Sequence, residues 1–100
     1  MVDFVVTNTG MKIEFDQAKR DKTLLERGLD FAESGLVFAG RHCTAPDLRV
    51  DYGEDRFISI GILSGRTVVL VWTERRSARR IISMRYANER EISRYKQYVG

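Results

Sequence analysis

Two apolar segments separated by two residues constrain the fold more than any other feature of this sequence. RFISIGIL (56–63) and RTVVLVWTE (66–74) flank Ser64 and Gly65, a link of the length that joins antiparallel strands in a tight hairpin. Residues 68–72 are apolar at every position, so both faces of this strand should be covered and the strand should be central. The sequence therefore predicts an antiparallel sheet built around this hairpin.

Further segments extend the predicted sheet. ARRIISMRY (78–86) follows a short turn at 75–77 and predicts the next antiparallel strand. MKIEF (11–15) alternates apolar with charged residues, the pattern of a short edge strand. We therefore expect a meander of at least three antiparallel strands after one early strand.

Helix start and stop signals predict the remaining elements of the fold. We predict three helices, over about 17–27, 31–40 and 89–98. Asp16, Asp30 and Asn88 are suited to N-caps, and Gly28 ends the first helix. The expected architecture is α+β, with two N-terminal helices packed on a twisted antiparallel sheet and a C-terminal helix.

One small domain accounts for the chain. One hundred residues, 43% of them hydrophobic, suffice for a single core. We place this domain at 11–100 and interpret 1–10, with VDFVV and a turn-like TNTG, as an N-terminal extension. This extension either pairs VDFVV with the sheet edge or stays disordered, and we expect it to have no catalytic role. No apolar run approaches the ~20 residues that cross a bilayer, and no secretion signal opens the chain. We therefore expect a cytoplasmic protein without membrane contact.

Basic charge is concentrated in the C-terminal quarter. Residues 75–100 hold eight of the seventeen Lys and Arg residues and two acids, a net charge of +6, whereas residues 1–74 carry −3. Guanidinium groups stay ionised and offer paired donors that match two phosphate oxygens. Nucleic acid is therefore the first partner to consider.

Four blocks of the chain carry a resemblance to a known family. They are IEFDQAK (13–19), RGLDFAESGLVF (27–38), GEDRFISIG (53–61) and GRTVVLVWTERRSARRIISMRYANERE (65–91). In these blocks the chain resembles the BrnT family, ribonuclease toxins of bacterial type II toxin–antitoxin pairs with a fold similar to that of RelE toxins. Four positions depart from the family pattern. Thr23, Glu26 and Arg27 stand where members usually have asparagine, lysine and histidine, and the usual Ser-Ala-Arg reads Ser-Met-Arg at 83–85.

The resemblance implies a ribonuclease toxin that cleaves mRNA, and we expect it to act without a metal or other cofactor. It also implies a BrnA-like antitoxin, which would cover the basic face in a toxin–antitoxin hetero-oligomer. Operator DNA would be contacted only through the antitoxin, so that the complex represses its own operon. The alternative is a catalytically weakened homologue that serves as an antitoxin-binding or nucleic-acid-binding module.

Candidate catalytic residues lie in the last block. Metal-free RNA cleavage needs an aligned ribose 2′-OH, charge relief at the phosphorane and proton transfer. We assign charge relief to Arg85 with Arg75, at the end of the neighbouring strand, as a phosphate-facing pair; solvated charges near a turn are the alternative. Glu74 and Tyr86 are the candidates for proton transfer, or in the case of Tyr86 a core aromatic.

Further cations are candidates for RNA-backbone contact. Arg79 shares strand parity with Arg85, whereas Arg80 would reach the same surface only across a bulge. Arg27 is equally suited to the C-terminal dipole of the first helix, and exposed helix lysines often only solubilise. The predicted RNA-binding residues are Arg27, Arg76, Arg79, Arg80 and Lys19.

His42 and Cys43 do not predict a metal site. They are adjacent in sequence and lack the spacing and the further ligands that zinc needs. We interpret Cys43 as a partly buried small side chain rather than a nucleophile.

Overall fold

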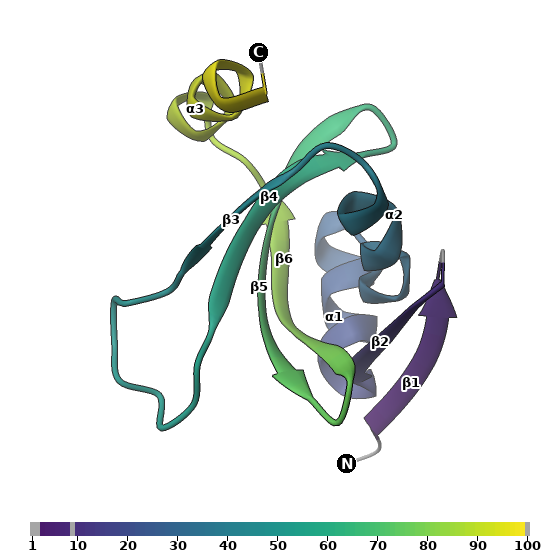
Figure 1. The fold of residues 1–100 in the computed structure, drawn as a ribbon. Helices are drawn as coiled ribbons and strands as arrows, with labels where there is room; N and C mark the ends of the chain where they lie inside the picture. Colours follow the sequence, from purple (N-terminus) through teal and green to yellow (C-terminus); the bar gives the residue numbers. More distant parts are fainter. Residues whose placement is uncertain (1–2, 9, 100) are drawn as a thin grey trace.

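One six-stranded sheet and three helices form the fold in the computed structural model, which describes residues 3–8 and 10–99 (Figure 1). The elements in chain order are β1 (Asp3–Asn8), β2 (Met11–Asp16), α1 (Gln17–Arg27), η1 (Phe31–Glu33, a 3₁₀ turn), α2 (Ser34–Ala39), β3 (Cys43–Pro46), β4 (Phe57–Leu63), β5 (Arg66–Arg75), β6 (Ala78–Tyr86) and α3 (Glu89–Val99). The predicted α+β class is confirmed.

The sheet is mixed, and it begins at the N-terminus. Its strand order is β1-β2-β6-β5-β4-β3, and every neighbouring pair is antiparallel except β2 with β6. In that parallel pair Ile13 lies opposite Arg79 and Phe15 opposite Ile81. The expectation of a purely antiparallel sheet with two leading helices is therefore wrong, because a β-hairpin precedes α1.

The N-terminal segment changes which strand lies at the edge. β1 pairs along its length with β2, so β2 lies inside the sheet and the prediction that MKIEF forms an edge strand is wrong. The prediction that residues 1–10 form a separate extension without a catalytic role stays a prediction. Residues 1, 2, 9 and 100 lie outside the described part of the chain.

Local caps set the helix ends as the sequence predicts. Asp16 accepts a hydrogen bond from the backbone N–H of Ala18 at 2.9 Å, which satisfies one donor of the first turn of α1. Gly28 ends α1 with φ 70° and donates its N–H to the Leu24 carbonyl oxygen. α1 buries little apolar surface, since Leu25 is 88% exposed.

Two tight turns connect the central strands. Ser64 and Gly65 both have positive φ, which closes the predicted hairpin between β4 and β5. Arg76 and Ser77 adopt the same kind of turn between β5 and β6, with φ 50° and 67°. β5 therefore lies between β4 and β6, as its apolar sequence predicts.

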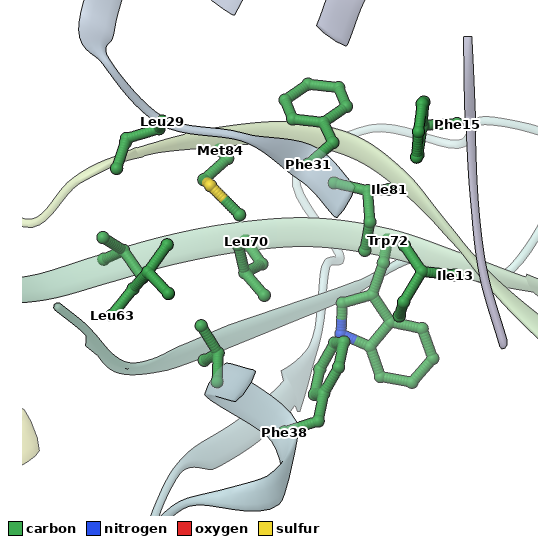
Figure 2. Packing of buried hydrophobic residues seen from close by; sticks show 12 residues of the cluster. Ile13, Phe15, Leu29, Phe31, Phe38, Leu63, Leu70, Trp72, Ile81 and Met84 are labelled. Carbon is green, nitrogen blue, oxygen red and sulfur yellow. The ribbon is translucent and has the colours of Figure 1, made fainter. Parts of the chain in front are cut away.

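The core lies between the sheet and the short helical segments η1 and α2 (Figure 2). Leu70 and Met84 on neighbouring strands are fully buried, and Phe31 of η1 packs over them. Trp72 packs edge-on against Phe38 of α2, with ring centroids 5.4 Å apart. We call the side of the sheet that bears these residues the core face and the opposite side the outer face.

The three helices are distributed unevenly. α1 and α2 lie on the same side of the sheet, whereas α3 lies beyond β3 and β4 (Figure 1). The buried Tyr95 side chain attaches α3, and its hydroxyl donates to the Arg41 carbonyl oxygen at 2.7 Å. Among the described helices, none is long and apolar enough to span a membrane.

Candidate nucleic-acid interface

A bulge in β6 decides which arginines share a face of the sheet. Val71 lies opposite Ser83 and Trp72 opposite Ile81, so Ile82 has no partner on β5. Strand parity therefore changes at Ile82. As a result Arg80 and Arg85 lie on the outer face, while Arg79 lies on the core face. The prediction that Arg79 and Arg85 share a surface is wrong for this reason.

Arg85 is held by a carboxylate of α3. Its Nη1 and Nη2 donate to Oε1 and Oε2 of Glu91 at 2.8 and 2.9 Å, a bidentate ion pair. These hydrogen bonds lower the pKa of Glu91 to about 2. The Arg85 side chain remains 42% exposed, so it is accessible to a ligand although its charge is paired.

The predicted phosphate-facing pair is not brought together. Arg85 lies opposite Val69 and Arg75 opposite Ala78, at the two ends of the β5–β6 hairpin. Val69 and Arg75 are six residues apart along β5, which corresponds to roughly 20 Å at ~3.3 Å per residue. Arg75 forms an exposed ion pair with Glu54 at 3.3 Å instead.

The predicted proton-transfer residues are also separated from Arg85. Glu74 lies opposite Arg79 near the hairpin turn, at Arg75's end of the strand. Tyr86 follows Arg85 directly, but its ring packs against the core cluster and lies under the guanidinium of Arg66, 3.8 Å from the centroid. Neither side chain shares both the face and the strand end of Arg85.

Arg79 and Arg80, both predicted to bind RNA, make structural contacts. Arg79 lies 4.4 Å from the centroids of Phe38 and Trp72, and its burial lowers the pKa of its guanidinium. Arg80 donates to Glu14 at 2.7 Å and to Asp3 at 2.9 Å, which ties β6 to the N-terminal hairpin. Both side chains therefore make contacts that stabilise the fold.

A basic groove lies between α1 and the edge of β6 that faces away from β5. Arg27 crosses it, donating from Nη1 to the Met84 carbonyl oxygen at 2.8 Å. This carbonyl lies beyond Ile81, the last residue that pairs with β2, where no described strand lies on this edge of β6. The groove measures about 280 Å³ and is lined by Lys19, Lys22, Thr23, Glu26, Arg27, Phe31, Ile82 and Ser83.

Some of the predicted RNA-binding residues line the groove, and others lie elsewhere. Lys19 and Arg27 line it, and Arg85 is the next residue after the Met84 carbonyl that Arg27 contacts. Arg76 is exposed in the distant β5–β6 turn. We call the groove together with Arg85 the β6-edge site.

Sequence reasoning missed two residues near this site. Glu91 binds Arg85 six residues earlier in the preceding strand, and such an ion pair leaves no periodic signal in the sequence. Arg49 also acts on Arg85, since its positive charge opposes the rise in the pKa of Arg85 that Glu91 causes. Lys22, three residues after Lys19 on α1, also lines the groove.

His42 and Cys43 have local contacts. The His42 Nδ1 lies 2.9 Å from the Gly40 carbonyl oxygen, and its ring packs edge-on against Phe38. The Cys43 thiol points to the Ile60 carbonyl oxygen at 3.9 Å. Over the described residues, no cluster of three or more His, Cys, Asp or Glu side chains is arranged to hold a metal ion.

The comparison with protein families identifies the chain. The model of a family described as the ribonuclease toxin BrnT of type II toxin–antitoxin systems matches residues 15–91. A search of curated proteins found no match. The family match covers most of the chain, including α1, the whole β4–β6 meander and Glu91. The chain therefore belongs to the BrnT family of type II ribonuclease toxins, which confirms the resemblance.

Proposed function

We propose that this BrnT-family protein is a metal-independent endoribonuclease that binds the RNA backbone along the β6-edge site. Membership in the family supports a ribonuclease toxin with RNA as substrate and an antitoxin protein as partner. The observation that carries the location is the Arg27 contact to Met84, which places the cations of α1 beside the strand edge that leads to Arg85. Lys19 and Lys22 lie on the same groove wall.

The chemistry follows from what these side chains offer. Ammonium and guanidinium groups along the groove neutralise successive phosphates and fix the register of the strand. In this proposal the ribose 2′-OH attacks the phosphorus and releases its proton to water, and Arg85 stabilises the extra negative charge that develops on the phosphorane. The P–O5′ bond then breaks, which leaves a 2′,3′-cyclic phosphate and a 5′-oxygen that takes up a proton from water. This division of roles requires no metal, because the positive charge comes from protonated side chains.

The partner proposed is a BrnA-like antitoxin. A type II antitoxin is a protein that binds the toxin, and an acidic or apolar segment laid along the β6-edge site would exclude RNA by occupying its cations. Contact with operator DNA would be made by the antitoxin alone. The complex would then repress its own operon.

The decisive measurement is cleavage of a purified single-stranded RNA, with and without chelator. We expect cleavage by the unaltered chain in both conditions and loss of about a hundredfold in Arg85→Ala. Arg90→Ala, which removes an exposed arginine from the first turn of α3, is the matched control and should cleave normally. Activity that disappears with chelator contradicts metal independence, and an active Arg85→Ala contradicts the assignment of Arg85.

A second candidate function is a weakened toxin that binds RNA or antitoxin without efficient cleavage. Two observations favour it: Arg27 occupies the family's histidine position, and neither Glu74 nor Tyr86 lies on Arg85's face at its strand end. A guanidinium stays protonated at ordinary pH and is a poor general base. Tight RNA or antitoxin binding without product in the same assay would select this candidate.

A further inference from the structure

The guanidinium of Arg85 is engaged along one edge only. Within the described part of the chain, its hydrogen bonds all start from the two terminal nitrogens: two to Glu91 and one, at 3.4 Å, from Nη1 to the Tyr86 carbonyl oxygen. A guanidinium carries five N–H groups, and two of them on the Nε side form a parallel pair. The edge formed by Nε and the second hydrogen of Nη2 is therefore left to match two phosphate oxygens.

The carboxylate that holds Arg85 is itself fixed. Glu91 Oε1 also accepts the backbone N–H of Asn88 at 2.9 Å, and the Glu91 N–H donates to the Asn88 side chain at 2.9 Å. This reciprocal pair is a capping box, which ties the carboxylate to the first turn of α3. The Glu91 side chain is only 21% exposed. Arg85 therefore rests against a rigid support rather than against a mobile surface carboxylate.

We propose that Glu91 is a positioning residue, which holds the Arg85 guanidinium so that its Nε edge faces a phosphate of the bound RNA. The proposal rests on the proposed function, in which RNA passes Arg85. Arginine has many rotamers, and a guanidinium that is already oriented loses less freedom when it meets the transition state. The carboxylate also reduces the net charge that attracts RNA, so orientation and affinity should respond in opposite directions when Glu91 is altered.

The test therefore compares RNA affinity with cleavage rate in a Glu91 variant. In Glu91→Gln, we expect the RNA dissociation constant to stay the same or fall, while the single-turnover cleavage rate falls at least tenfold. Glu89→Gln makes the same charge change at an exposed position in the same helix turn, and it should share the binding effect without the loss of rate. A Glu91→Gln rate equal to that of Glu89→Gln overturns the proposal. A faster rate also overturns it, because Glu91 would then be restraining Arg85.

A second variant and a double variant separate positioning from folding. Glu91→Asp keeps the charge but shortens the side chain by one methylene, which draws the carboxylate back from the two Nη atoms; its cleavage should slow while its RNA affinity stays unchanged. In an Arg85→Ala background, Glu91→Gln should cause no further loss of rate, because Glu91 acts through Arg85. A further loss of rate in that background overturns the proposal.

An NMR measurement keeps the proposal testable if the unaltered chain does not cleave RNA. In ¹H–¹⁵N spectra we expect a distinct Arg85 Nε–H signal that moves when a short single-stranded RNA is added and that merges with the exposed arginines in Glu91→Gln. Absence of cleavage with this behaviour would reject the proposed activity but support positioning by Glu91. An Nε–H signal unchanged by RNA or by the substitution would reject positioning.

Discussion

Arg27 and Met84 lie 57 residues apart in the chain, yet the Arg27 guanidinium donates to the Met84 carbonyl oxygen at 2.8 Å. This hydrogen bond joins the last residue of α1 to the edge of β6 beyond its pairing with β2. An edge carbonyl satisfied in this way is closed to a further strand. The contact therefore fixes the groove between α1 and β6 and keeps the strand edge available to a ligand other than a β-strand.

Replacing Arg27 should loosen this junction. Arg27→Met keeps most of the aliphatic stem but removes the donor to Met84, and we expect the free energy of unfolding to fall by about 1 kcal/mol. Urea unfolding measures this change. Arg90→Met on exposed α3 is the control and should leave stability within about 0.5 kcal/mol. Equal stability of the two variants would show that the Arg27–Met84 contact contributes nothing to the fold.

Removing Arg80 should detach the N-terminal hairpin from β6. Arg80→Ala leaves Glu14, whose side chain is 15% exposed, without its ion-pair partner. We expect a loss of roughly 2 kcal/mol, less than for a fully buried pair. The double substitution Arg80→Met with Glu14→Met removes both charges and should recover much of this loss. Thermal unfolding of the three proteins checks the prediction, and a double variant no more stable than Arg80→Ala would contradict it.

RNA affinity should depend steeply on salt through the groove lysines. Each phosphate neutralised on a single strand contributes a slope of roughly 0.7 in the logarithm of affinity against the logarithm of salt concentration. Lys19→Gln with Lys22→Gln should therefore lower the slope by up to about 1.4. Lys12→Gln with Lys96→Gln removes the same charge from outside the groove lining. An identical slope in the two double variants would exclude the groove as the RNA platform.

Acid should destabilise the protein partly through Glu91. Its folded-state pKa is about 2, below the ordinary 4.5, because Arg85 and the Asn88 backbone N–H stabilise the ionised form. A depressed pKa contributes stability that is present above about pH 4.5 and is lost as the pH falls toward 2. Urea unfolding between pH 6 and pH 2.5 should therefore show a shallower acid loss in Glu91→Gln than in Glu89→Gln. Parallel pH profiles would contradict the shifted pKa.

Gly61 should not tolerate a side chain. A Cβ at this position would lie 2.7 Å from Cγ1 of Val37 and 3.1 Å from Cβ of His42, so α2 would have to move away from β4. We expect Gly61→Ala to cost roughly 1 to 3 kcal/mol, the range for overpacking. Gly40→Ala is the matched control, because its Cβ would meet only ordinary contacts at 3.7 Å or more. Similar thermal midpoints for the two variants would contradict this prediction.

The sequence predicts the ends of elements well because those signals are local. Asp16 and Gly28 act on backbone groups within a few residues of themselves, and the Asn88–Glu91 capping box has the same short range. The hairpin at Ser64 likewise needs only its two flanking strands. Each of these features can be read without knowing which distant segments meet.

The long-range pairings could not be predicted in the same way. The parallel register of β2 with β6 depends on side chains that pack across the whole sheet, and the Arg80–Glu14 pair spans 66 residues. The bulge at Ile82 reverses the face of every earlier residue of β6, which is why Arg79 was assigned to the wrong surface. The face on which each arginine of β6 lies therefore depends on the bulge at Ile82, which the strand-like sequence does not predict.

Because β2 pairs with residues 79–81 of β6, translation must pass these residues before the sheet can close. Residues 79–81, which pair with β2, are synthesised long after the N-terminal hairpin. Until then the nascent chain has neither the inner neighbour of β2 nor the Ile81 and Met84 side chains of the core. Arg27 of α1 consequently reaches the Met84 carbonyl only after β6 has been synthesised, and a translation product that stops before β6 carries no assembled β6-edge site.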